Sequence, residues 1–319
     1  MTISQDSSAP LVAVVGVTGV QGGSVIRALL DSSKPYRIRA FTRDPKKGAA
    51  LSLTAQGLEI VGLSIVLDNA KEVVKAFSGA DIVFLVTNFF EHLDADRETA
   101  EGKMMIDAAK SAGVARIVWS GLPNCAKISN GKYTYAVHFD GKAVVSEYGR
   151  QCGVPFVDVQ CGYYASDMLN PKRSPIQRKD DGSFAMIVPV DEGTVLPVID
   201  AVGDYGLYVR QVIEASVFPD GEEFRTGEYL TLREIAAQVS QATGKRIVVE
   251  QIPLEMFRVA IATKMPPHIV LDFCDVWKCT EEFGFYGGKP ISGLGGERQP
   301  VTLKNFAAEA DWSQVLASG

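Results

Sequence analysis

The stretch LVAVVGVTGVQGG, residues 11–23, decides the fold together with the segment that follows it, SVIRALL, residues 24–30. Residues 11–15 form a continuous apolar run without polar alternation, which predicts a strand covered on both faces. Residues 24–30 have apolar side chains at helical spacing, which predicts a helix. Between these two segments stand Gly16, Gly19 and Gly22. The chain is therefore expected to form a strand, a glycine-rich turn and a helix in direct succession.

This arrangement predicts a site for a bound phosphate group. Gly16 allows a tight turn out of the strand, Gly19 lets the backbone approach a pyrophosphate, and Gly22 permits close packing of the helix against the strand. The helix N-terminus adds free N–H groups and a partial positive charge. We therefore expect a dinucleotide at this turn, and a glycine turn without a ligand is the alternative.

Strands and helices alternate through the first half of the chain. Buried-strand patterns occur at residues 38–42, 59–62, 82–86, 116–120 and 156–160, and helical spacing occurs at residues 71–78, 94–112 and 136–152. Such alternation is typical of βαβ units. We expect an α/β fold with a Rossmann-type, doubly wound parallel sheet whose crossovers are right-handed.

The pattern changes after residue 161. Residues 170–182 (NPKRSPIQRKDDG) are polar and contain prolines, which predicts an exposed loop, and helical candidates follow at residues 204–215, 231–243, 254–262, 267–283 and 303–311. We expect a dinucleotide-binding Rossmann domain over residues 1–161 and a smaller, interleaved α+β region over residues 162–319. This second region would bind a substrate or partner and could return a strand or helix to the first domain.

The composition excludes several classes of protein. The 319 residues are 46% hydrophobic and 22% charged with a net charge of -6, so neither a disordered chain nor a broad nucleic-acid-binding face is expected. No apolar run approaches the roughly 20 residues of a membrane-spanning helix. The first ten residues do not resemble a secretory signal. The five cysteines include no Cys-x-x-Cys pair, so we expect free thiols, no metal site and a cytoplasmic location, with a nuclear one also open.

The end of the second strand indicates which dinucleotide binds. Sheets specific for NAD place an acidic residue about 20 residues after the glycine turn, whereas this strand ends at Arg43, 21 residues after Gly22. A guanidinium pairs well with a phosphate and stacks beside an adenine. We therefore expect NADP(H), bound by Arg43 with Lys47 as a second cation. Asp44 is an alternative ribose ligand, although it precedes a proline as a helix N-cap does.

Several segments carry a family resemblance that covers most of the chain and is densest up to about residue 165. They are residues 16–25 (GVTGVQGGSV), 42–45 (TRDP), 86–91 (VTNFFE), 101–103 (EGK), 112–114 (AGV), 119–122 (WSGL) and 138–142 (HFDGK). Together they resemble the NmrA-like family of atypical short-chain dehydrogenases/reductases, in particular the branch that includes a human NmrA-like redox sensor and fungal relatives. The resemblance implies an NADP(H)-binding fold in which several members show little or no dehydrogenase activity.

The resemblance also implies positions for the cofactor. Its pyrophosphate would contact the turn formed by Gly16, Thr18, Gly19, Val20, Gln21 and Gly22, and its 2′-phosphate would contact Arg43 and Lys47. Along the rest of the cleft would lie Thr87, Asn88, Phe89, Lys142, Cys161, Gly162, Tyr163 and Tyr164. The chain departs from the family after the third strand, where residues 62–65 (GLSI) replace the usual Gly-Asp pattern and the later acid is Asp68. The contact with the adenine therefore stays open.

The catalytic residues of typical short-chain dehydrogenases are only partly present. Those enzymes supply a proton from a tyrosine that stands four residues before a lysine, one helical turn away. Here the lysine is Lys142, but the position four residues earlier is His138. His138 could donate the proton because a histidine pKa lies near neutrality. Tyr135 is a second candidate, and Ser120 could orient a substrate oxygen; a structural role is the alternative for each of them.

Two functions therefore compete. A cofactor turn beside an altered catalytic set favours an NADP(H)-binding redox sensor or regulator with a protein partner and weak or no dehydrogenase activity. A cleft with Phe89, Phe90, Tyr163 and Tyr164 would instead suit an NADPH-dependent reductase of a small apolar or aromatic carbonyl, quinone or imine. We favour the first because the proton-donor position is altered. A scaffold without cofactor is a third hypothesis, and both a monomer and a homodimer are open.

Overall fold

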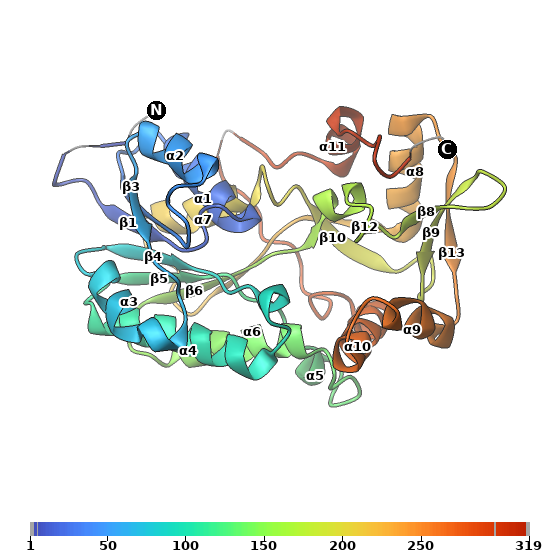
Figure 1. Ribbon diagram of the computed structural model, residues 1–319, viewed down its shortest axis with the longest axis horizontal. Coiled ribbons are helices and arrows are strands. Elements are labelled where there is room, and N and C mark those ends of the chain that lie inside the picture. Colours follow the sequence, from blue (N-terminus) through green and yellow to red (C-terminus); the bar gives the residue numbers. More distant parts are fainter. Residues whose placement is uncertain (1–2, 5, 297, 317–319) are drawn as a thin grey trace.

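The computed structural model describes residues 3–4, 6–296 and 298–316. Its largest element is a seven-stranded parallel sheet with the strand order β11-β6-β5-β4-β1-β2-β3 (Figure 1). The strands are β1 (Leu11–Val14), β2 (Arg37–Thr42), β3 (Glu59–Gly62), β4 (Ile82–Leu85), β5 (Arg116–Trp119), β6 (Phe156–Gln160) and β11 (Glu223–Arg225). The order runs outward from β1 in both directions, which confirms the doubly wound sheet.

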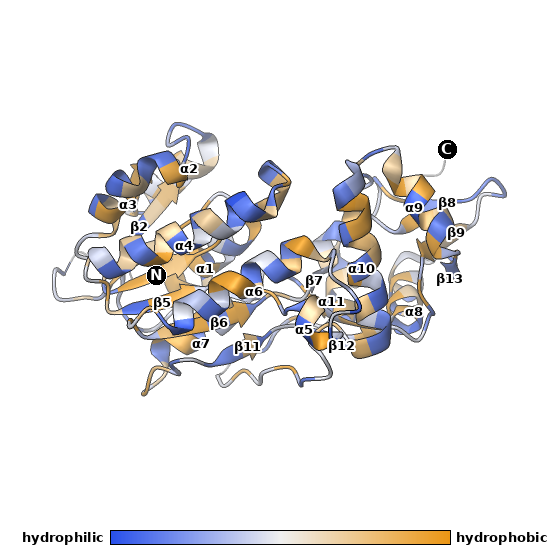
Figure 2. Ribbon diagram, turned by 90° about the horizontal axis from the view of Figure 1, so that it is seen from below, coloured by the Kyte–Doolittle hydropathy of each residue, from blue (hydrophilic) through white to orange (hydrophobic). Residues whose placement is uncertain are grey.

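Helices cover both faces of this sheet, as Figure 1 shows. One face packs against α1 (Val20–Leu30) and α7 (Tyr205–Glu214), and the other against α3 (Ala70–Phe77), α4 (Ala95–Ser111) and α6 (Val137–Arg150). Within β1, Val12 and Val14 belong to one core and Leu11 and Ala13 to the other. The continuous apolar run thus arises because side chains of successive strand residues point to opposite, equally buried faces. Figure 2 shows these strands as mostly hydrophobic ribbon between helices of mixed character.

The later part of the chain contributes to the large sheet. Strand β11 pairs in parallel with β6, and α7 packs against α1. The approach of these two helices is close, since a Cβ on Gly206 would lie 2.1 Å from the carbonyl oxygen of Ser24. Residues 1–161 therefore share their sheet and one of its helical layers with segments that follow the sixth strand.

The smaller part of the molecule contains two three-stranded sheets, with the orders β12-β10-β7 and β13-β9-β8. These strands are β7 (Tyr163–Tyr164), β8 (Ile176–Arg178), β9 (Phe184–Val188), β10 (Val195–Ile199), β12 (Glu228–Thr231) and β13 (Ile247–Gln251). The helices are α8 (Leu232–Thr243), α9 (Leu254–Ala262), α10 (Pro267–Phe283) and α11 (Leu303–Glu309), and two short ones, α2 (Gly48–Ala55) and α5 (Cys125–Ile128), belong to the first half. Within the described ranges, no helix combines the length and apolar character that a membrane span requires.

Local sequence explains some of these elements and fails for others. Helix α8 begins at a capping box, in which the Thr231 side chain accepts from the backbone N–H of Glu234 and the Glu234 side chain accepts in return. The loop expected over residues 170–182 was wrong in part, because it contains β8, where Ile176 is 3% exposed and joins the apolar core. A strand of three residues with one buried side chain is too short for its alternation to stand out.

Candidate functional site

A cleft of about 710 Å³ lies at the carboxyl ends of β1, β2, β4, β5 and β6 and reaches α10 of the smaller part. This is the edge at which doubly wound sheets bind ligands. Most of the residues that the sequence singles out line it, namely Gly16, Thr18, Gly19, Val20, Gln21, Gly22, Arg43, Thr87, Asn88, Phe89, Ser120, His138, Lys142, Cys161, Gly162, Tyr163 and Tyr164. Two of the predicted residues, Lys47 and Tyr135, are not among the lining residues.

The glycine turn has the geometry that its spacing predicts. Gly16 adopts a φ of +71°, a left-handed conformation that an L side chain rarely takes. A Cβ on Gly22 would lie 2.3 Å from the carbonyl oxygen of Gly16, so helix α1 can approach the strand end only with glycine there. Helix α1 follows directly after Gly19, which has no side chain to cap it. The free N–H groups of this first turn fit a pyrophosphate.

Arg43 meets a carboxylate at the mouth of the cleft. Its guanidinium forms an ion pair with Glu91, which follows β4 in the short helical turn Phe89–Glu91. The two side chains are 65% and 46% exposed, so the pair remains open to solvent and to a competing anion. Lys47 is exposed at the start of α2. Where the sequence departs from the family pattern, residues 63–66 line the cleft, whereas Asp68 is not among the lining residues.

Lys142 is held by a buried carboxylate that the sequence analysis missed. Its Nζ lies 3.0 Å from Oε1 of Glu98 in α4 and donates a hydrogen bond of 2.7 Å to Thr87 Oγ1. The Thr87 hydroxyl donates in turn to Glu98 Oε1 at 2.7 Å. Glu98 is fully buried, on the same helical face as Gly102 and Met105. A glutamate on the apolar face of a predicted helix was the available signal, because a buried charge needs a partner.

His138 forms a second buried pair, with Asp272 of α10. The His138 Nδ1 lies 2.5 Å from Asp272 Oδ2, and the backbone N–H of His138 donates to Asp272 Oδ1 at 3.0 Å. Asp272 is fully buried and His138 is 8% exposed. Because the carboxylate accepts from Nδ1, the other ring nitrogen, Nε2, is left for a ligand, and it has no hydrogen-bond partner among the described residues.

Aromatic rings surround the His138 imidazole. The ring centroids of Phe89, Phe90, Phe139 and Phe273 lie 5.5, 5.7, 4.8 and 5.9 Å from that of His138. Like Asp272, Phe273 comes from α10, so the smaller part of the molecule completes this end of the cleft. The surroundings are apolar and suit a flat, weakly polar ligand.

The other proposed catalytic residues are placed differently. Ser120 Oγ donates a hydrogen bond of 2.7 Å to Gln21 Oε1, so its hydroxyl joins the end of β5 to the glycine turn. Tyr135 lies outside the cleft lining: the residue is 54% exposed, and its backbone N–H donates to Asp275 Oδ2. Helix α6 begins only at Val137, so Tyr135 does not share a helical face with Lys142.

The segment after β6 is buried beside the cleft. Burial raises the pKa of the Cys161 thiol to about 12, so this thiol is neutral near pH 7. The chain passes close to β10 at Gly162, because a Cβ there would lie only 2.1 Å from the carbonyl oxygen of Pro197 and glycine has none. Burial also raises the phenol pKa of Tyr163 and of Tyr164, so both phenols are protonated hydrogen-bond donors.

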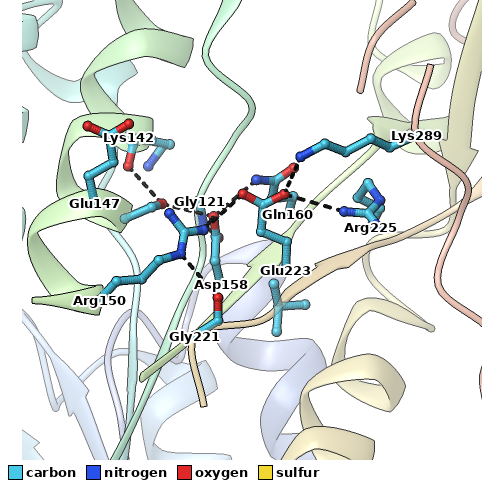
Figure 3. A network of polar contacts seen from close by, with 12 residues as sticks. Gly121, Lys142, Glu147, Arg150, Asp158, Gln160, Gly221, Glu223, Arg225 and Lys289 are labelled. Carbon is cyan, nitrogen blue, oxygen red and sulfur yellow. Dashed lines mark hydrogen bonds and ion pairs between the residues drawn. The ribbon is translucent and has the colours of Figure 1, made fainter. Parts of the chain in front are cut away.

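A polar network around Asp158 connects the cleft residue Gly121 with residues that lie outside the cleft lining (Figure 3). Asp158 in β6 is fully buried, and its carboxylate accepts hydrogen bonds from the backbone N–H of Gly121, from Ser146 Oγ and from Gln160 Nε2 at 2.9–3.0 Å. Burial raises the pKa of Asp158 to about 6. Arg150 lies 3.7 Å from this carboxylate and pairs with Glu223 of β11 at 2.9 Å. The network thus ties a residue of the cleft wall to α6 and to the last strand of the sheet.

A glycine turn, a doubly wound sheet and a cleft at its carboxyl edge define the Rossmann-type class of α/β proteins. Within this class the chain belongs to the NmrA-like family, whose model matches residues 8–310.

Similar proteins include both oxidoreductases and a regulator. The NmrA-like family domain-containing oxidoreductase FrzB of a Cladobotryum species is 32% identical over 259 residues, 76% of either chain. The nitrogen metabolite repression protein NmrA of Emericella nidulans is 28% identical over 260 residues, 78% of this chain and 70% of that one. This chain is therefore similar to proteins with two different kinds of function.

Similar solved structures include complexes with both dinucleotides. The negative transcriptional regulator NmrA in complex with NAD has a TM-score of 0.72 at 23% identity, covering 94% of this chain and 95% of that one. The same regulator in complex with NADP has a TM-score of 0.69 at 24% identity, covering 94% and 90%. At these identities the likeness shows the fold, and the choice of dinucleotide in this chain has to be argued from its own residues.

Proposed function

We propose that the protein is an NADPH-dependent reductase of a flat, apolar or aromatic carbonyl, quinone or imine. The observation that carries this proposal is the His138–Asp272 pair beside an aromatic cleft, in which the second imidazole nitrogen has no hydrogen-bond partner in the part of the chain that the structure describes. Within this pair, His138 stands four residues before Lys142, where the typical enzymes of the superfamily have their tyrosine. It therefore supplies a replacement for the altered proton donor that favoured a purely regulatory function in the sequence.

In this proposal some cleft residues bind the cofactor and others transfer the proton. The glycine turn binds the pyrophosphate, Arg43 binds the 2′-phosphate, and the fixed ammonium of Lys142 faces the ribose side of the cleft. The bound nicotinamide would supply a hydride. His138 holds a proton on Nε2 and gives it to the oxygen or nitrogen that becomes negative as the substrate is reduced. Asp272 stabilises the imidazolium from the Nδ1 side.

The test is NADPH oxidation by the purified protein with a panel of quinones, aromatic ketones and imines. We expect turnover with at least one class, loss of turnover in His138→Phe, and NADPH affinity in that variant close to that of the wild type. Lys142→Ala should weaken cofactor binding as well as turnover. Tight NADPH binding without turnover of any class would contradict the reductase proposal.

A redox-sensing function is the second candidate, and the Arg43–Glu91 pair favours it. A 2′-phosphate that binds Arg43 would displace Glu91 and with it the turn Phe89–Glu91, in which Phe90 is 48% exposed. Occupancy by NADP(H) would then alter a surface that a protein partner could contact. Faster hydrogen exchange of residues 89–91 on addition of NADP(H), in a protein without turnover, would support this function. The unpaired state of all five cysteines supports a reducing compartment, the cytoplasm or nucleus, for either function.

A further inference from the structure

Two of the five cysteines meet in the interior, although they are far apart in the sequence. Cys125 begins α5 and Cys279 lies in the last part of α10, 154 residues later. The Sγ of Cys279 lies 3.8 Å from the carbonyl oxygen of Cys125. Both side chains belong to the same apolar core and are 3% and 2% exposed. Neither residue has a part in the cofactor or proton chemistry proposed above.

The two thiols differ in acidity. A hydrogen bond with Cys125 lowers the pKa of Cys279, and the same contact, with burial, raises the pKa of Cys125. Cys279 is therefore the more acidic of the two, and in this structure its thiol donates to the carbonyl oxygen of Cys125. A more acidic thiol with a neighbouring thiol is the arrangement of a nucleophilic cysteine and a resolving cysteine.

The pair stands where the short helix α5 meets α10, which lines the cleft together with α6. Helix α5 follows the cleft wall at Gly121 and Leu122, and the N–H of Ala126 donates to Asp140 Oδ1 of α6 at 3.3 Å. Helix α10 carries Asp272 and, beside Cys279, the cleft residue Thr280. A covalent link between α5 and α10 would therefore fix the helix that completes the aromatic end of the cleft.

We propose that Cys125 and Cys279 are a reversible redox site, which a peroxide oxidises to a disulfide that locks α10 onto the cleft wall. The Cys279 thiolate attacks one oxygen of hydrogen peroxide, the O–O bond breaks, and the released hydroxide takes a proton to become water. The Cys125 sulfur then attacks the Cys279 sulfenic acid and loses its proton, and a second water leaves. Two thiols and one peroxide thus give one disulfide and two waters.

Small oxidants can approach from two sides. Thr280 lines the large cleft next to Cys279, and a second cavity of about 190 Å³ is lined by Asn124 and Lys127, on either side of Cys125 in the chain. Because both sulfur atoms are buried, the reaction requires local opening of this region and should be slower than oxidation of an exposed thiolate. The proposal does not depend on turnover, so it can succeed or fail separately from the reductase function.

The test is peptide mapping by mass spectrometry of the full-length protein after brief exposure to stoichiometric hydrogen peroxide under native conditions. We expect a peptide pair linked through Cys125 and Cys279, loss of two hydrogens in the intact mass, and reversal by dithiothreitol. In Cys125→Ser the link should be lost and Cys279 should instead carry sulfenic or sulfinic acid. Cys152→Ser and Cys274→Ser are matched controls that should retain the link.

A second measurement keeps the proposal testable without any variant. Hydrogen exchange of the wild-type protein should show slower exchange in α10 after peroxide treatment than before it, and dithiothreitol should reverse the change. Unmodified Cys125 and Cys279 in a protein that peroxide has oxidised at other cysteines would overturn the proposal. So would links that appear only between other cysteines.

Discussion

Asp272 binds His138 at two points, with Oδ1 3.0 Å from the backbone nitrogen and Oδ2 2.5 Å from Nδ1 of the ring. The carboxylate therefore fixes both the start of helix α6 and the direction of the imidazole. Because Asp272 belongs to α10, the smaller part of the molecule decides how a residue of the large sheet domain faces the cleft. The following predictions test this relationship and three others.

Asp272→Asn should impair catalysis more than cofactor binding. Asparagine keeps the shape of the side chain but removes the charge that stabilises the imidazolium, and a hydrogen bond to a charged group contributes about 1.5–3 kcal/mol. We expect kcat to fall by about 10- to 100-fold, by the same arithmetic, with little change in the KM for NADPH. The control is Asp275→Asn, which removes a carboxylate on the same helix that binds the backbone of Tyr135 outside the cleft. Equal losses in both variants would point to a structural function of Asp272 only.

Glu91→Gln should tighten binding of NADP(H). The carboxylate competes with the 2′-phosphate for Arg43, and an exposed ion pair of this kind contributes about 0.5–1 kcal/mol, so the affinity should rise by about two- to fivefold. NAD(H) affinity should change less, and Arg43→Glu should abolish the preference for NADP(H). Calorimetric titration measures all of these. Glu192→Gln is a matched control, because its partner Arg233 forms a similarly exposed pair away from the cleft. An unchanged affinity in Glu91→Gln would place the 2′-phosphate elsewhere.

Gly22→Ala should destabilise the fold and weaken cofactor binding. The added Cβ would lie 2.3 Å from the Gly16 carbonyl oxygen, so α1 must move away from the strand end. Overpacking of this kind costs about 1–3 kcal/mol of the free energy of unfolding. Gly48→Ala is the control, since its Cβ would meet nothing within 4 Å and alanine favours the helix. Urea unfolding of both variants would contradict this prediction if Gly22→Ala were as stable as the wild type.

Asp158 should make the stability of the protein depend on pH below neutrality. Burial raises its pKa in the folded protein to about 6, from the ordinary value of 3.8, so the folded state binds the proton more tightly than the unfolded state. Its contribution to stability is therefore fully present below about pH 4 and is lost as the pH rises to about 6, a change of about 3 kcal/mol. Asp158→Asn should remove this component from the pH profile of urea unfolding. Asp107→Asn, a surface change beside Tyr148, should leave the profile unaltered.

Local sequence determined the parts of this protein that depend on neighbouring residues. The apolar run in β1 and the glycine spacing each predicted a feature at its observed place, and Arg43 lies in the cleft lining, while its contact with a 2′-phosphate stays a prediction. Helix limits were also close, with residues 94–112 expected and Ala95–Ser111 observed for α4. These predictions succeed because strand burial, turn conformation and helical periodicity are properties of a few consecutive residues.

The tertiary structure alone decided which buried groups meet. Asp272 and Glu98 stand on apolar helix faces, where a carboxylate needs a partner, but the sequence does not say that the partners are His138, 134 residues away, and Lys142. Tyr135 would share a helical face with Lys142 only if the helix included it, but α6 begins two residues later, at Val137. The fold follows from local patterns of burial, whereas the chemistry of the cleft depends on contacts that form only when α4 and α10 pack against α6.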